Sequence, residues 1–393
     1  MNKIILKPGK EKAVVRHHPW IFSGAIDTVM GDPENGSSVQ VFDSKKNFLG
    51  IGAFSPYSQI RVRMWSFDNE EIGQTFFEKR IAGSIKRRSQ LMKKYDDSAW
   101  RLINAESDQI PGLIVDQYND VLVVQILSSG SEYQRNTIVD ALKKITGLNN
   151  IYERSDLDVR KIEGLKERTG PISGNLPHEI LIKEGGHQFI VDLEHSQKTG
   201  FYLDQRLNRR IVADYCMDKD VLNVFSFTGG FSIYAVGSNA KKVVSVDSSK
   251  EALDLAKRNH ILNGFSDNEH EWIEGDAFQL LRKMRDQNKK FDVVILDPPK
   301  FAPTAAHVDK AARAYKDINL LGFKLLNPGG ILVTFSCSGG LNEGLFQKIV
   351  SDAALDAGAY ATILEKLNQG PDHPVSLNFP EGAYLKGLIC LKN

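Results

Sequence analysis

The sequence predicts an α/β protein whose C-terminal half is a doubly wound, Rossmann-like sheet. Two observations carry this prediction: short apolar runs alternate with helical segments from about residue 185 onward, and polar or glycine-rich turns follow several of these runs. The first 70 residues instead show short runs of alternating apolar and polar residues, which predict the strands of an all-β, barrel-like domain. A small α+β segment, residues 71–184, lies between them.

Composition bounds the function. At 393 residues the chain is long for one core, so two or three domains are expected. A net charge of +1 argues against a polycation, and any nucleic-acid contact must come from local patches. No apolar run approaches a membrane span, Met1 opens no signal peptide, and the three cysteines are scattered. We therefore expect a cytoplasmic, reduced protein with no membrane partner, no disulfide framework and no metal site.

The N-terminal strands are expected at 38–43, 48–54 and 60–65. Arg61 and Arg63 alternate with apolar neighbours on the last of these, so both should point to one face and are candidate phosphate contacts. The middle segment begins with an amphipathic helix whose polar side is basic. Its run from Lys86 to Arg88 is interpreted as a solvated helix face.

The C-terminal sheet is expected to contain five strands, at 221–225, 242–246, 272–274, 293–296 and 331–335. The intervening helices should begin near Ser232, Lys250, Phe278, Lys310 and Glu343. The segment 327–330, Asn-Pro-Gly-Gly, predicts a turn that ends one helix and starts the last strand.

Candidate cofactor residues lie where the first three strands end. The loop after the first strand contributes Phe225, Ser226, Thr228 and Gly229. Asp247 ends the second strand, about twenty residues on, where an acidic residue commonly binds ribose hydroxyls, and Asp276 follows the third and could reach an adenine edge. Each feature alone is commonly a turn or a helix cap, but together they favour an adenosyl cofactor. Because the loop lacks a G-x-G-x-x-G pattern, S-adenosylmethionine is favoured over NAD.

Asp297 and Cys337 follow the fourth and fifth strands, which should deliver a carboxylate and a thiol to one sheet edge. Pro298 and Pro299 make a rigid turn that suits contact with a planar base, and Lys300 follows as a further substrate contact, although such a turn also ends ordinary strands. A thiolate that adds to carbon 6 of a pyrimidine makes carbon 5 nucleophilic toward a methyl donor. In isolation a cysteine is more often a small buried hydrophobe, and this is how Cys216 and Cys390 are interpreted.

Several motifs resemble one family over essentially the whole chain: the bacterial large-subunit (23S) ribosomal RNA cytosine-C5 methyltransferases with an N-terminal PUA domain. Residues 18–26 and 50–55 resemble its PUA entry, and residues 104–108 and 111–116 resemble its central domain. Residues 197–206, Gln-Lys-Thr-Gly-Phe-Tyr-Leu-Asp-Gln-Arg, resemble its cofactor-side motif. The resemblance implies a PUA domain at 1–70, a central domain at 71–184 and a methyltransferase domain at 185–393.

The resemblance also implies residue roles. Near the methionine end of the cofactor it places Lys198, Tyr202, Asp204 and Arg206. It implies that Cys337 is the nucleophile and that Asp297 orients the base, near the ring N3 and exocyclic amine. It further implies large-subunit ribosomal RNA as partner and allows a homodimer. Many RNA cytosine-C5 methyltransferases carry a second cysteine in the Asp-Pro-Pro region, so the group that removes the carbon-5 proton is not evident.

Three alternatives stay open. The first is a guanine methyltransferase that uses Asp297 with no covalent step; related enzymes of that kind lack a cysteine at the position of Cys337. The second is a catalytically inactive RNA-binding assembly factor, which the complete cofactor strip from 223 to 276 disfavours. The third is an NAD-dependent dehydrogenase, which the glycine pattern disfavours.

Overall fold

The computed structural model describes residues 2–194, 199–266, 270–301 and 308–393, and the chain divides into two compact units. Unit 1 consists of residues 1–182, 191–203 and 371–382. Unit 2 consists of residues 183–190, 204–370 and 383–393. Each unit is therefore built from segments that are distant in the sequence.

A seven-stranded sheet forms the centre of unit 2, in the order β16-β15-β14-β17-β18-β20-β19. Its strands are β14 (Asp220–Val224), β15 (Lys242–Asp247), β16 (His270–Glu274), β17 (Phe291–Leu296), β18 (Leu326–Ser336), β19 (Ala361–Leu367) and β20 (Lys386–Lys392). The first five in spatial order are parallel, whereas β20 runs antiparallel to both β18 and β19. The five predicted strands are confirmed, and the two strands beyond β18, the antiparallel β20 and the edge strand β19, were not predicted.

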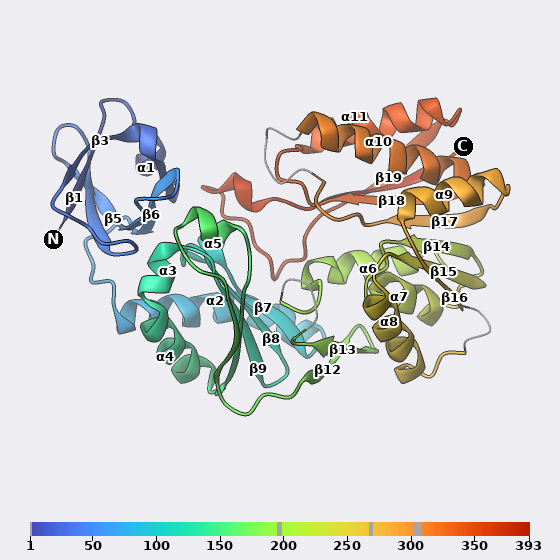
Figure 1. Ribbon diagram of the computed structural model, residues 1–393, viewed down its shortest axis with the longest axis horizontal. Helices are drawn as coiled ribbons and strands as arrows, with labels where there is room; N and C mark the ends of the chain where they lie inside the picture. Colours follow the sequence, from blue (N-terminus) through green and yellow to red (C-terminus); the bar gives the residue numbers. More distant parts are fainter. Residues whose placement is uncertain (1, 195–198, 267–269, 302–307) are drawn as a thin grey trace. The chain divides into compact units, whose positions relative to one another are not determined.

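Helices cover both faces of this sheet, which confirms the doubly wound prediction (Figure 1). Helices α7 (Gly230–Gly237) and α8 (Lys250–Leu262) lie on one face, and α9 (Ala277–Asp286), α10 (Val308–Leu325) and α11 (Glu343–Asp356) on the other. All five begin close to the predicted positions. Three of them have side-chain caps, from Ser249 on α8, Asp276 on α9 and Asn342 on α11. Helix α6 (Arg206–Ala213), which precedes β14, was not predicted.

The predicted turn at 327–330 is an irregularity inside β18. Leu326 pairs with Phe291 and Ile331 pairs with Val293, so the residues between them leave the ladder. Gly329 has a φ of +72°, a conformation that glycine adopts at little cost. The chain thus pairs with β17 on both sides of the predicted turn.

The N-terminal part of unit 1 is a six-stranded sheet in the order β2-β6-β5-β4-β1-β3. Its strands are β1 (Lys3–Leu6), β2 (Trp20–Phe22), β3 (Ile26–Met30), β4 (Ser38–Phe42), β5 (Phe48–Phe54) and β6 (Ile60–Ser66), with the short helix α1 (Lys12–Val15) after β1. All its pairings are antiparallel except β1 with β4. Val39, Val41 and Val62 lie in its core.

The second sheet of unit 1 has five strands in the order β11-β10-β9-β8-β7. Its elements are α2 (Gln74–Lys94), β7 (Ala99–Asn104), η2 (Ala105–Asp108), β8 (Leu113–Tyr118), β9 (Val121–Ile126), α3 (Ser129–Tyr133), α4 (Arg135–Thr146), β10 (Asn150–Ser155), α5 (Val159–Ile162) and β11 (Arg168–Ser173). Trp65 of β6 packs edge-on against Phe76 and Phe77 of α2 within this second core. The two sheets therefore share apolar contacts across the predicted boundary at residue 70.

A two-stranded hairpin, β12 (Glu179–Glu184) and β13 (His187–Asp192), follows β11, and its tip, residues 183–190, belongs to unit 2. The predicted boundaries at 70 and 184 stay predictions. Within the described ranges, none of the helices combines the length and apolar character that crossing a membrane requires.

Candidate functional site

The loop that follows β14 has an unusual backbone. Phe225 and Phe227 have φ values of 61° and 47°, in the left-handed region that residues with a Cβ rarely adopt. Such a residue costs about 1–3 kcal/mol and persists where its surroundings hold it. The Asp247 carboxylate at the end of β15 helps to hold Phe227 in this conformation, because its Oδ2 accepts a hydrogen bond from the Phe227 amide at 2.8 Å. Contacts from the neighbouring strand thus hold the loop in this shape.

Two hydroxyl groups in this loop are available to a ligand. Ser226 and Thr228 are buried, and neither side-chain oxygen has a hydrogen-bond partner among the described residues. An unpaired buried polar group costs about 1–3 kcal/mol, so such groups are few in native proteins. Gly229, with a φ of +84°, then leads into α7, and a Cβ at this position would lie 3.1 Å from the Ala256 Cβ. The loop therefore combines a glycine packed closely against α8 with two unused hydrogen-bonding groups.

Asp247 and Asp276 lie on the same edge of the sheet. Asp247 is the last residue of β15, and its Oδ1 accepts a hydrogen bond from the Ser249 amide at 2.9 Å. Asp276 follows β16, and its Oδ1 accepts from the Gln279 amide at 2.9 Å, which caps α9. Both carboxylates shape the loops at this edge. Their roles as cofactor ligands stay predictions. Each carboxylate oxygen has a second lone pair and can therefore accept a further hydrogen bond from a ligand.

Asp297 and Cys337 follow neighbouring strands. β17 and β18 pair in parallel with Leu296 opposite Thr334, so the chain leaves both strands at the same edge of the sheet. This is the arrangement that the sequence predicts for the carboxylate and the thiol. Thr334 Oγ1 is buried and has no hydrogen-bond partner within the described part of the chain.

The Asp297 carboxylate is held by a buried amide. Gln205, buried before α6, donates from Nε2 to Asp297 Oδ2 at 3.0 Å. Of the residues that follow, Pro298 is buried whereas Pro299 and Lys300 are exposed. The turn therefore keeps its first proline inside the protein and presents the next two residues to solvent, as a substrate contact requires.

Cys337 is half-buried between two buried serines. The Ser338 amide donates to Ser336 Oγ at 3.3 Å, and the Tyr315 hydroxyl lies 3.1 Å from Ser338 Oγ. The backbone on either side of the thiol is thus tied to the strand that precedes it and to α10.

The other two cysteines are buried, and burial raises the pKa of each thiol to about 12. For Cys216 the nearby carboxylate of Asp214 adds to this effect. Cys390 lies in β20. Both observations agree with the packing role that the sequence predicts.

The predicted cofactor residues Asp204 and Arg206 are buried and already bonded. Asp204 Oδ2 accepts from the Tyr384 hydroxyl at 2.6 Å. The Glu184 carboxylate is contacted by Arg206 Nε at 3.4 Å and by Arg209 Nη2 at 2.7 Å. These bonds position the start of α6, and a cofactor contact from either predicted residue stays a prediction.

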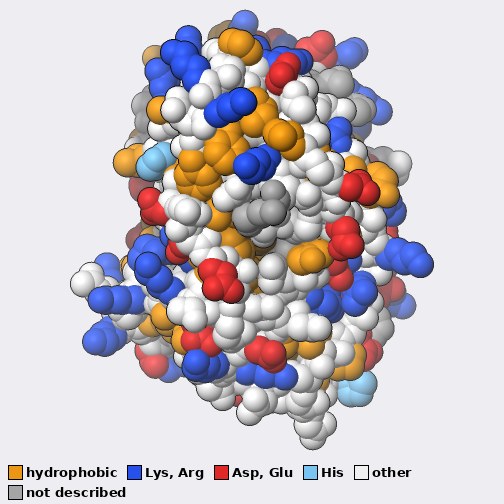
Figure 2. Space-filling model, turned by 90° about the vertical axis from the view of Figure 1, so that its left-hand side faces the viewer, with side chains coloured by type: hydrophobic (Ala, Val, Ile, Leu, Met, Phe, Trp, Pro, Cys, Tyr) orange, Lys and Arg blue, Asp and Glu red, His pale blue; other side chains and the backbone are white. Residues whose placement is uncertain are grey.

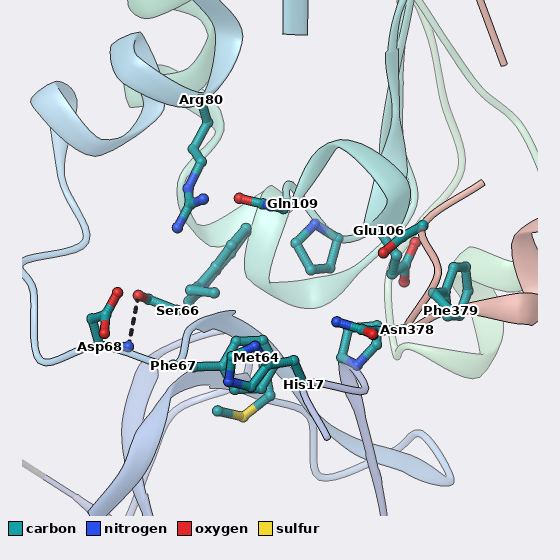
Figure 3. Close-up of a pocket in the computed structure, with 14 residues that line it drawn as sticks. His17, Met64, Ser66, Phe67, Asp68, Arg80, Glu106, Gln109, Asn378 and Phe379 are labelled. Carbon is teal, nitrogen blue, oxygen red and sulfur yellow. Dashed lines mark hydrogen bonds between the residues drawn. The ribbon is translucent and has the colours of Figure 1, made fainter. Parts of the chain in front are cut away.

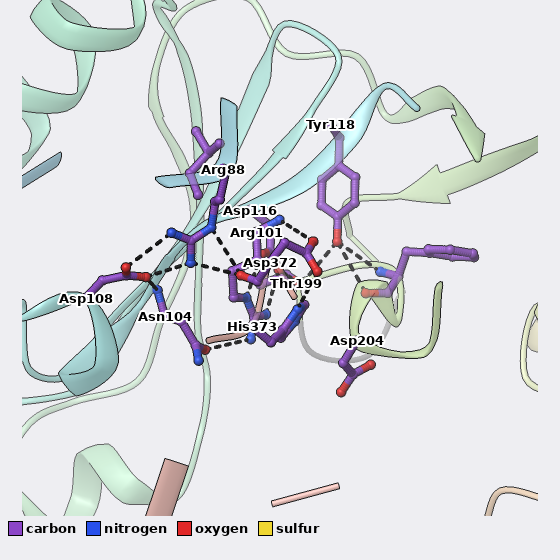
Figure 4. A network of polar contacts seen from close by, with 12 residues as sticks. Arg88, Arg101, Asn104, Asp108, Asp116, Tyr118, Thr199, Asp204, Asp372 and His373 are labelled. Carbon is purple, nitrogen blue, oxygen red and sulfur yellow. Dashed lines mark hydrogen bonds and ion pairs between the residues drawn. The ribbon is translucent and has the colours of Figure 1, made fainter. Parts of the chain in front are cut away.

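Within the predicted motif 197–206, residues 199–201 are held by a polar network in unit 1 (Figure 4). Thr199 Oγ1 donates to Asp116 Oδ2 at 2.6 Å, and Arg101 donates to both Asp116 oxygens at 2.8 Å. The Phe201 amide donates to the Tyr118 hydroxyl at 3.2 Å. Strand β8, which carries Asp116 and Tyr118, therefore sets the path of residues 199–201.

Two further predicted cofactor residues flank this segment. Lys198 lies outside the described residues. Tyr202 is half-buried and belongs to unit 1. Their roles near the cofactor stay predictions.

The run from Lys86 to Arg88 was expected to be a solvated face, and for Arg88 this is wrong. Arg88 is 1% exposed and donates to both Asp108 oxygens, at 2.6 and 3.1 Å, and to the Asp372 carbonyl (Figure 4). Burial raises the pKa of Asp108, but the hydrogen bonds and charge of Arg88 and Arg87 outweigh this effect and bring the pKa below its ordinary value. The helix thereby anchors the segment 371–382.

The two candidate phosphate contacts differ. Arg63 is 8% exposed, and its guanidinium is held by Glu106 at 2.7 Å and Glu163 at 3.1 Å, which disfavours a phosphate contact. Arg61 is half-buried and donates from Nη1 to the Ser55 carbonyl. Figure 2 shows Lys and Arg side chains interspersed with Asp and Glu on the face that it presents, in agreement with the net charge of +1.

A pocket of about 280 Å³ lies within unit 1, among β6, α2, η2 and the segment 371–382 (Figure 3). The rings of His17 and Phe67 stack on one side, with centroids 4.3 Å apart. Arg80, Gln109 and Asn378 add hydrogen-bonding groups to its lining. Aromatic faces beside polar side chains are the combination that binds unstacked RNA bases.

Several residues that build these sites were missed from the sequence. They are Glu184, Gln205, Tyr384 and Lys386. Gln205 lies inside the predicted motif and could have been singled out there. Glu184 comes from a hairpin tip, Tyr384 from the loop before the C-terminal strand and Lys386 from the start of that strand, and none of these local sequences contains a motif.

Comparisons with known proteins agree with this architecture. Residues 166–389 match the family model of S-adenosylmethionine-dependent methyltransferases, and residues 4–67 match that of PUA-like domains. The chain is 51% identical over 388 residues to the ribosomal RNA large subunit methyltransferase I of Aeromonas salmonicida, covering 98% of each chain. The protein of the same name from Pseudoalteromonas atlantica is 49% identical and covers 99% of each chain.

Two solved structures share the fold along their whole length. One is a protein from Streptococcus mutans assigned as an S-adenosylmethionine-dependent methyltransferase, with a TM-score of 0.86 and 22% identity. The other, assigned as a methyltransferase and solved in complex with SAH, has a TM-score of 0.88 and 23% identity. In both cases the match covers 100% of each chain. The α/β architecture with an N-terminal PUA-like domain is therefore confirmed.

Proposed function

The chain belongs to the family of S-adenosylmethionine-dependent methyltransferases, and from this premise we propose that it methylates carbon 5 of a cytosine in large-subunit ribosomal RNA. The observation that carries the proposal is the pair of neighbouring parallel strands, β17 and β18, that lead to Asp297 and Cys337. The names of the relatives support ribosomal RNA as the substrate class.

The loop after β14 fits the cofactor. S-adenosylmethionine, when bound, supplies an activated methyl group and carries no phosphate to be cradled. The unpaired hydroxyls of Ser226 and Thr228 suit its polar groups. Asp247 and Asp276 offer carboxylate oxygens at the next two strand ends for the ribose and the adenine.

In the proposed mechanism the Cys337 thiolate forms a bond to carbon 6 of the cytosine ring. This addition makes carbon 5 nucleophilic, so that carbon 5 would take the methyl group as its bond to the cofactor sulfur breaks and the neutral thioether leaves. Transfer of the carbon-5 proton to water then restores the double bond between carbons 5 and 6 and breaks the carbon–sulfur bond to Cys337, which releases the thiolate. Asp297, oriented by Gln205 through the 3.0 Å hydrogen bond, contacts the N3 edge and the exocyclic amine of the base.

A first experiment tests substrate and nucleophile together. Wild type, Cys337→Ala and Cys216→Ala proteins are incubated with labelled S-adenosylmethionine and unmodified large-subunit ribosomal RNA, followed by nucleoside analysis. We expect label in 5-methylcytidine with wild type and with Cys216→Ala, whose thiol is buried, and none with Cys337→Ala. Label in a methylated guanosine that survives Cys337→Ala would instead support the guanine reaction.

A trapping experiment separates the covalent step from binding. With 5-fluorocytosine in the RNA there is no carbon-5 proton to lose, so the thiolate cannot leave after methyl transfer. Wild type should form an adduct that survives denaturation, and Cys337→Ala should form none while retaining cofactor affinity. Absence of an adduct from active wild type would contradict the covalent mechanism.

We further propose that unit 1 contacts the RNA through Arg61 and the pocket of Figure 3. Arg61→Ala should weaken RNA binding and lower the slope of log affinity against log salt concentration by about one, as loss of a single phosphate contact does. Lys144→Ala, which removes the same charge from an exposed pair with Glu78, is the matched control and should leave the slope unchanged. If the slope of log affinity against log salt concentration is the same for Arg61→Ala, Lys144→Ala and wild type, Arg61 does not lie in the RNA interface.

A further inference from the structure

A buried lysine lies beside the candidate nucleophile. Lys386 opens β20, and its Cα is paired with that of Ser336, the last residue of β18. The chain turns from Ser336 directly into Cys337. Lys386 is 7% exposed, and its Nζ donates to the carbonyl of Ser338 at 2.8 Å. The ammonium group therefore contacts the residue on the far side of the thiol while its own backbone pairs with the residue on the near side.

The packing of the next residue, Gly387, fixes the position of Lys386 in the sheet. Gly387 follows it, and a Cβ on that glycine would lie 2.5 Å from Phe335 Cε1 and 2.9 Å from the Leu367 Cβ. Only glycine lets β20 approach β18 and β19 so closely. Strand β20 thus brings the lysine against the end of β18 by backbone pairing and by packing of its neighbour, rather than by a flexible loop.

The charge of Lys386 has no carboxylate partner within the described part of the chain, since its one hydrogen bond there goes to a neutral carbonyl. A buried cation is costly unless it is paired. Burial has the largest effect on the pKa of Lys386 and brings it below its ordinary value. Cys337 and Glu343 act in the opposite direction, and Lys300 lowers the pKa further. Tyr315, the other titratable group beside the thiol, is buried with a raised pKa and is neutral at ordinary pH.

We propose that Lys386 is the cation that stabilises the thiolate of Cys337 and holds its loop for attack. A thiolate supplies the negative charge that the buried ammonium lacks, and the ammonium in turn favours ionisation of the thiol. Lys386 is a positioning residue in this scheme: it acts on the thiol and touches no reacting atom of the RNA. The inference rests on the proposed function only in giving the thiolate a reaction to perform.

The test measures ionisation of the thiol without RNA or cofactor, so its outcome is independent of the proposed methylation. Iodoacetamide alkylates thiolates, forming a sulfur–carbon bond with loss of iodide, and peptide mass spectrometry assigns the modified cysteine. We expect the alkylation rate of Cys337 at pH 7 to fall about tenfold in Lys386→Met, which corresponds to an upward shift of the pH midpoint by about one unit. Lys386→Arg, which keeps the charge, should recover most of the rate. The buried Cys216 and Cys390 serve as internal references.

A second measurement needs no lysine variant and covers the case in which Lys386→Met does not fold. The thiolate absorbance near 240 nm is followed against pH for wild type minus Cys337→Ala. A midpoint clearly below about 8.5, the value of a free cysteine, is expected. A midpoint at or above that value, or identical alkylation profiles for wild type and a folded Lys386→Met, would overturn the proposal.

Methyl transfer gives the final readout. Lys386→Met should lower kcat with cofactor affinity unchanged, and activity should recover as the pH rises toward the free-thiol value, since the thiol then ionises unaided. Loss of activity that no pH restores, with a normal alkylation profile, would assign Lys386 to packing.

Discussion

The network around Arg88 in unit 1 and the loop after β14 in unit 2 use buried polar groups in opposite ways. Arg88 donates to Asp108 and to the Asp372 carbonyl (Figure 4). It also donates to Ser84 Oγ, and so distributes its charge over several acceptors. The loop after β14 buries the hydroxyls of Ser226 and Thr228 with no partner among the described residues and keeps two aromatic residues at positive φ.

This difference separates stability from function. Saturated polar networks rigidify a fold, and removing one member leaves the others buried and unpaired. Unsaturated buried groups cost stability and are retained where a ligand completes them. The comparison therefore predicts that substitutions in the first region change the free energy of unfolding, whereas substitutions in the second change ligand affinity.

The largest expected effect comes from breaking the saturated network. Arg88→Met leaves the Asp108 carboxylate buried without its main partner, so the free energy of unfolding should fall by about 3–5 kcal/mol. Arg87→Met is the matched control: Arg87 pairs with the same carboxylate, but its side chain is half exposed, and the cost should stay below about 1 kcal/mol. Denaturant unfolding of both variants measures the difference. Similar losses in the two variants would mean that Asp108 relies on either arginine equally.

The same network shows why sequence reasoning failed at Arg88. Its neighbours on α2 are Lys86 and Arg87, and a basic run on an amphipathic helix is locally indistinguishable from a solvated face. The partners that bury Arg88 come from 20 and 284 residues away. No local pattern carries such information, because the segment 371–382 joins unit 1 only through the fold.

The sheet of unit 2 was predictable because its signals are local. Strand–helix alternation and polar turns at strand ends predict Asp247, Asp276, Asp297 and Cys337 on one edge of the sheet, and the strand order agrees. Strands β19 and β20 were missed because they do not continue the strand–helix alternation: the antiparallel β20 pairs with both β18 and β19. Lys386 was missed with them, because its significance lies in its pairing opposite Ser336.

An intermediate effect is expected from pH. The folded-state pKa of Asp108 lies below its ordinary value of 3.8. Its stabilising contribution is therefore complete above pH 3.8 and is lost as the pH falls from there through the lower folded-state pKa. The difference in unfolding free energy between wild type and Asp108→Asn should narrow by up to about 1.4 kcal/mol for each pH unit within this window. A constant difference down to pH 2 would show that the carboxylate titrates normally in the folded protein.

The smallest expected effect concerns the loop after β14, whose buried hydroxyls have no partner among the described residues. It tests most directly whether such groups serve ligand binding and not stability. Thr228→Val removes a hydroxyl that has no partner within the described residues, so the unfolding free energy should stay the same or rise slightly. Affinity for S-adenosylmethionine should fall about fivefold to tenfold. This corresponds to the loss of one hydrogen bond that contributes about 1–1.4 kcal/mol.

Ser232→Ala is the matched control for this substitution. Ser232, buried at the start of α7, is hydrogen-bonded to Asn223 at 2.8 Å and Ser245 at 2.6 Å. Its loss should lower stability by about 1–3 kcal/mol, because these partners stay buried, and should leave cofactor affinity unchanged. Calorimetric titration and thermal unfolding of the two variants together give opposite signatures if saturated groups serve the fold and unsaturated groups serve the ligand. Equal affinity loss in both variants would mean that the loop binds its cofactor through its overall shape and not through the Thr228 hydroxyl.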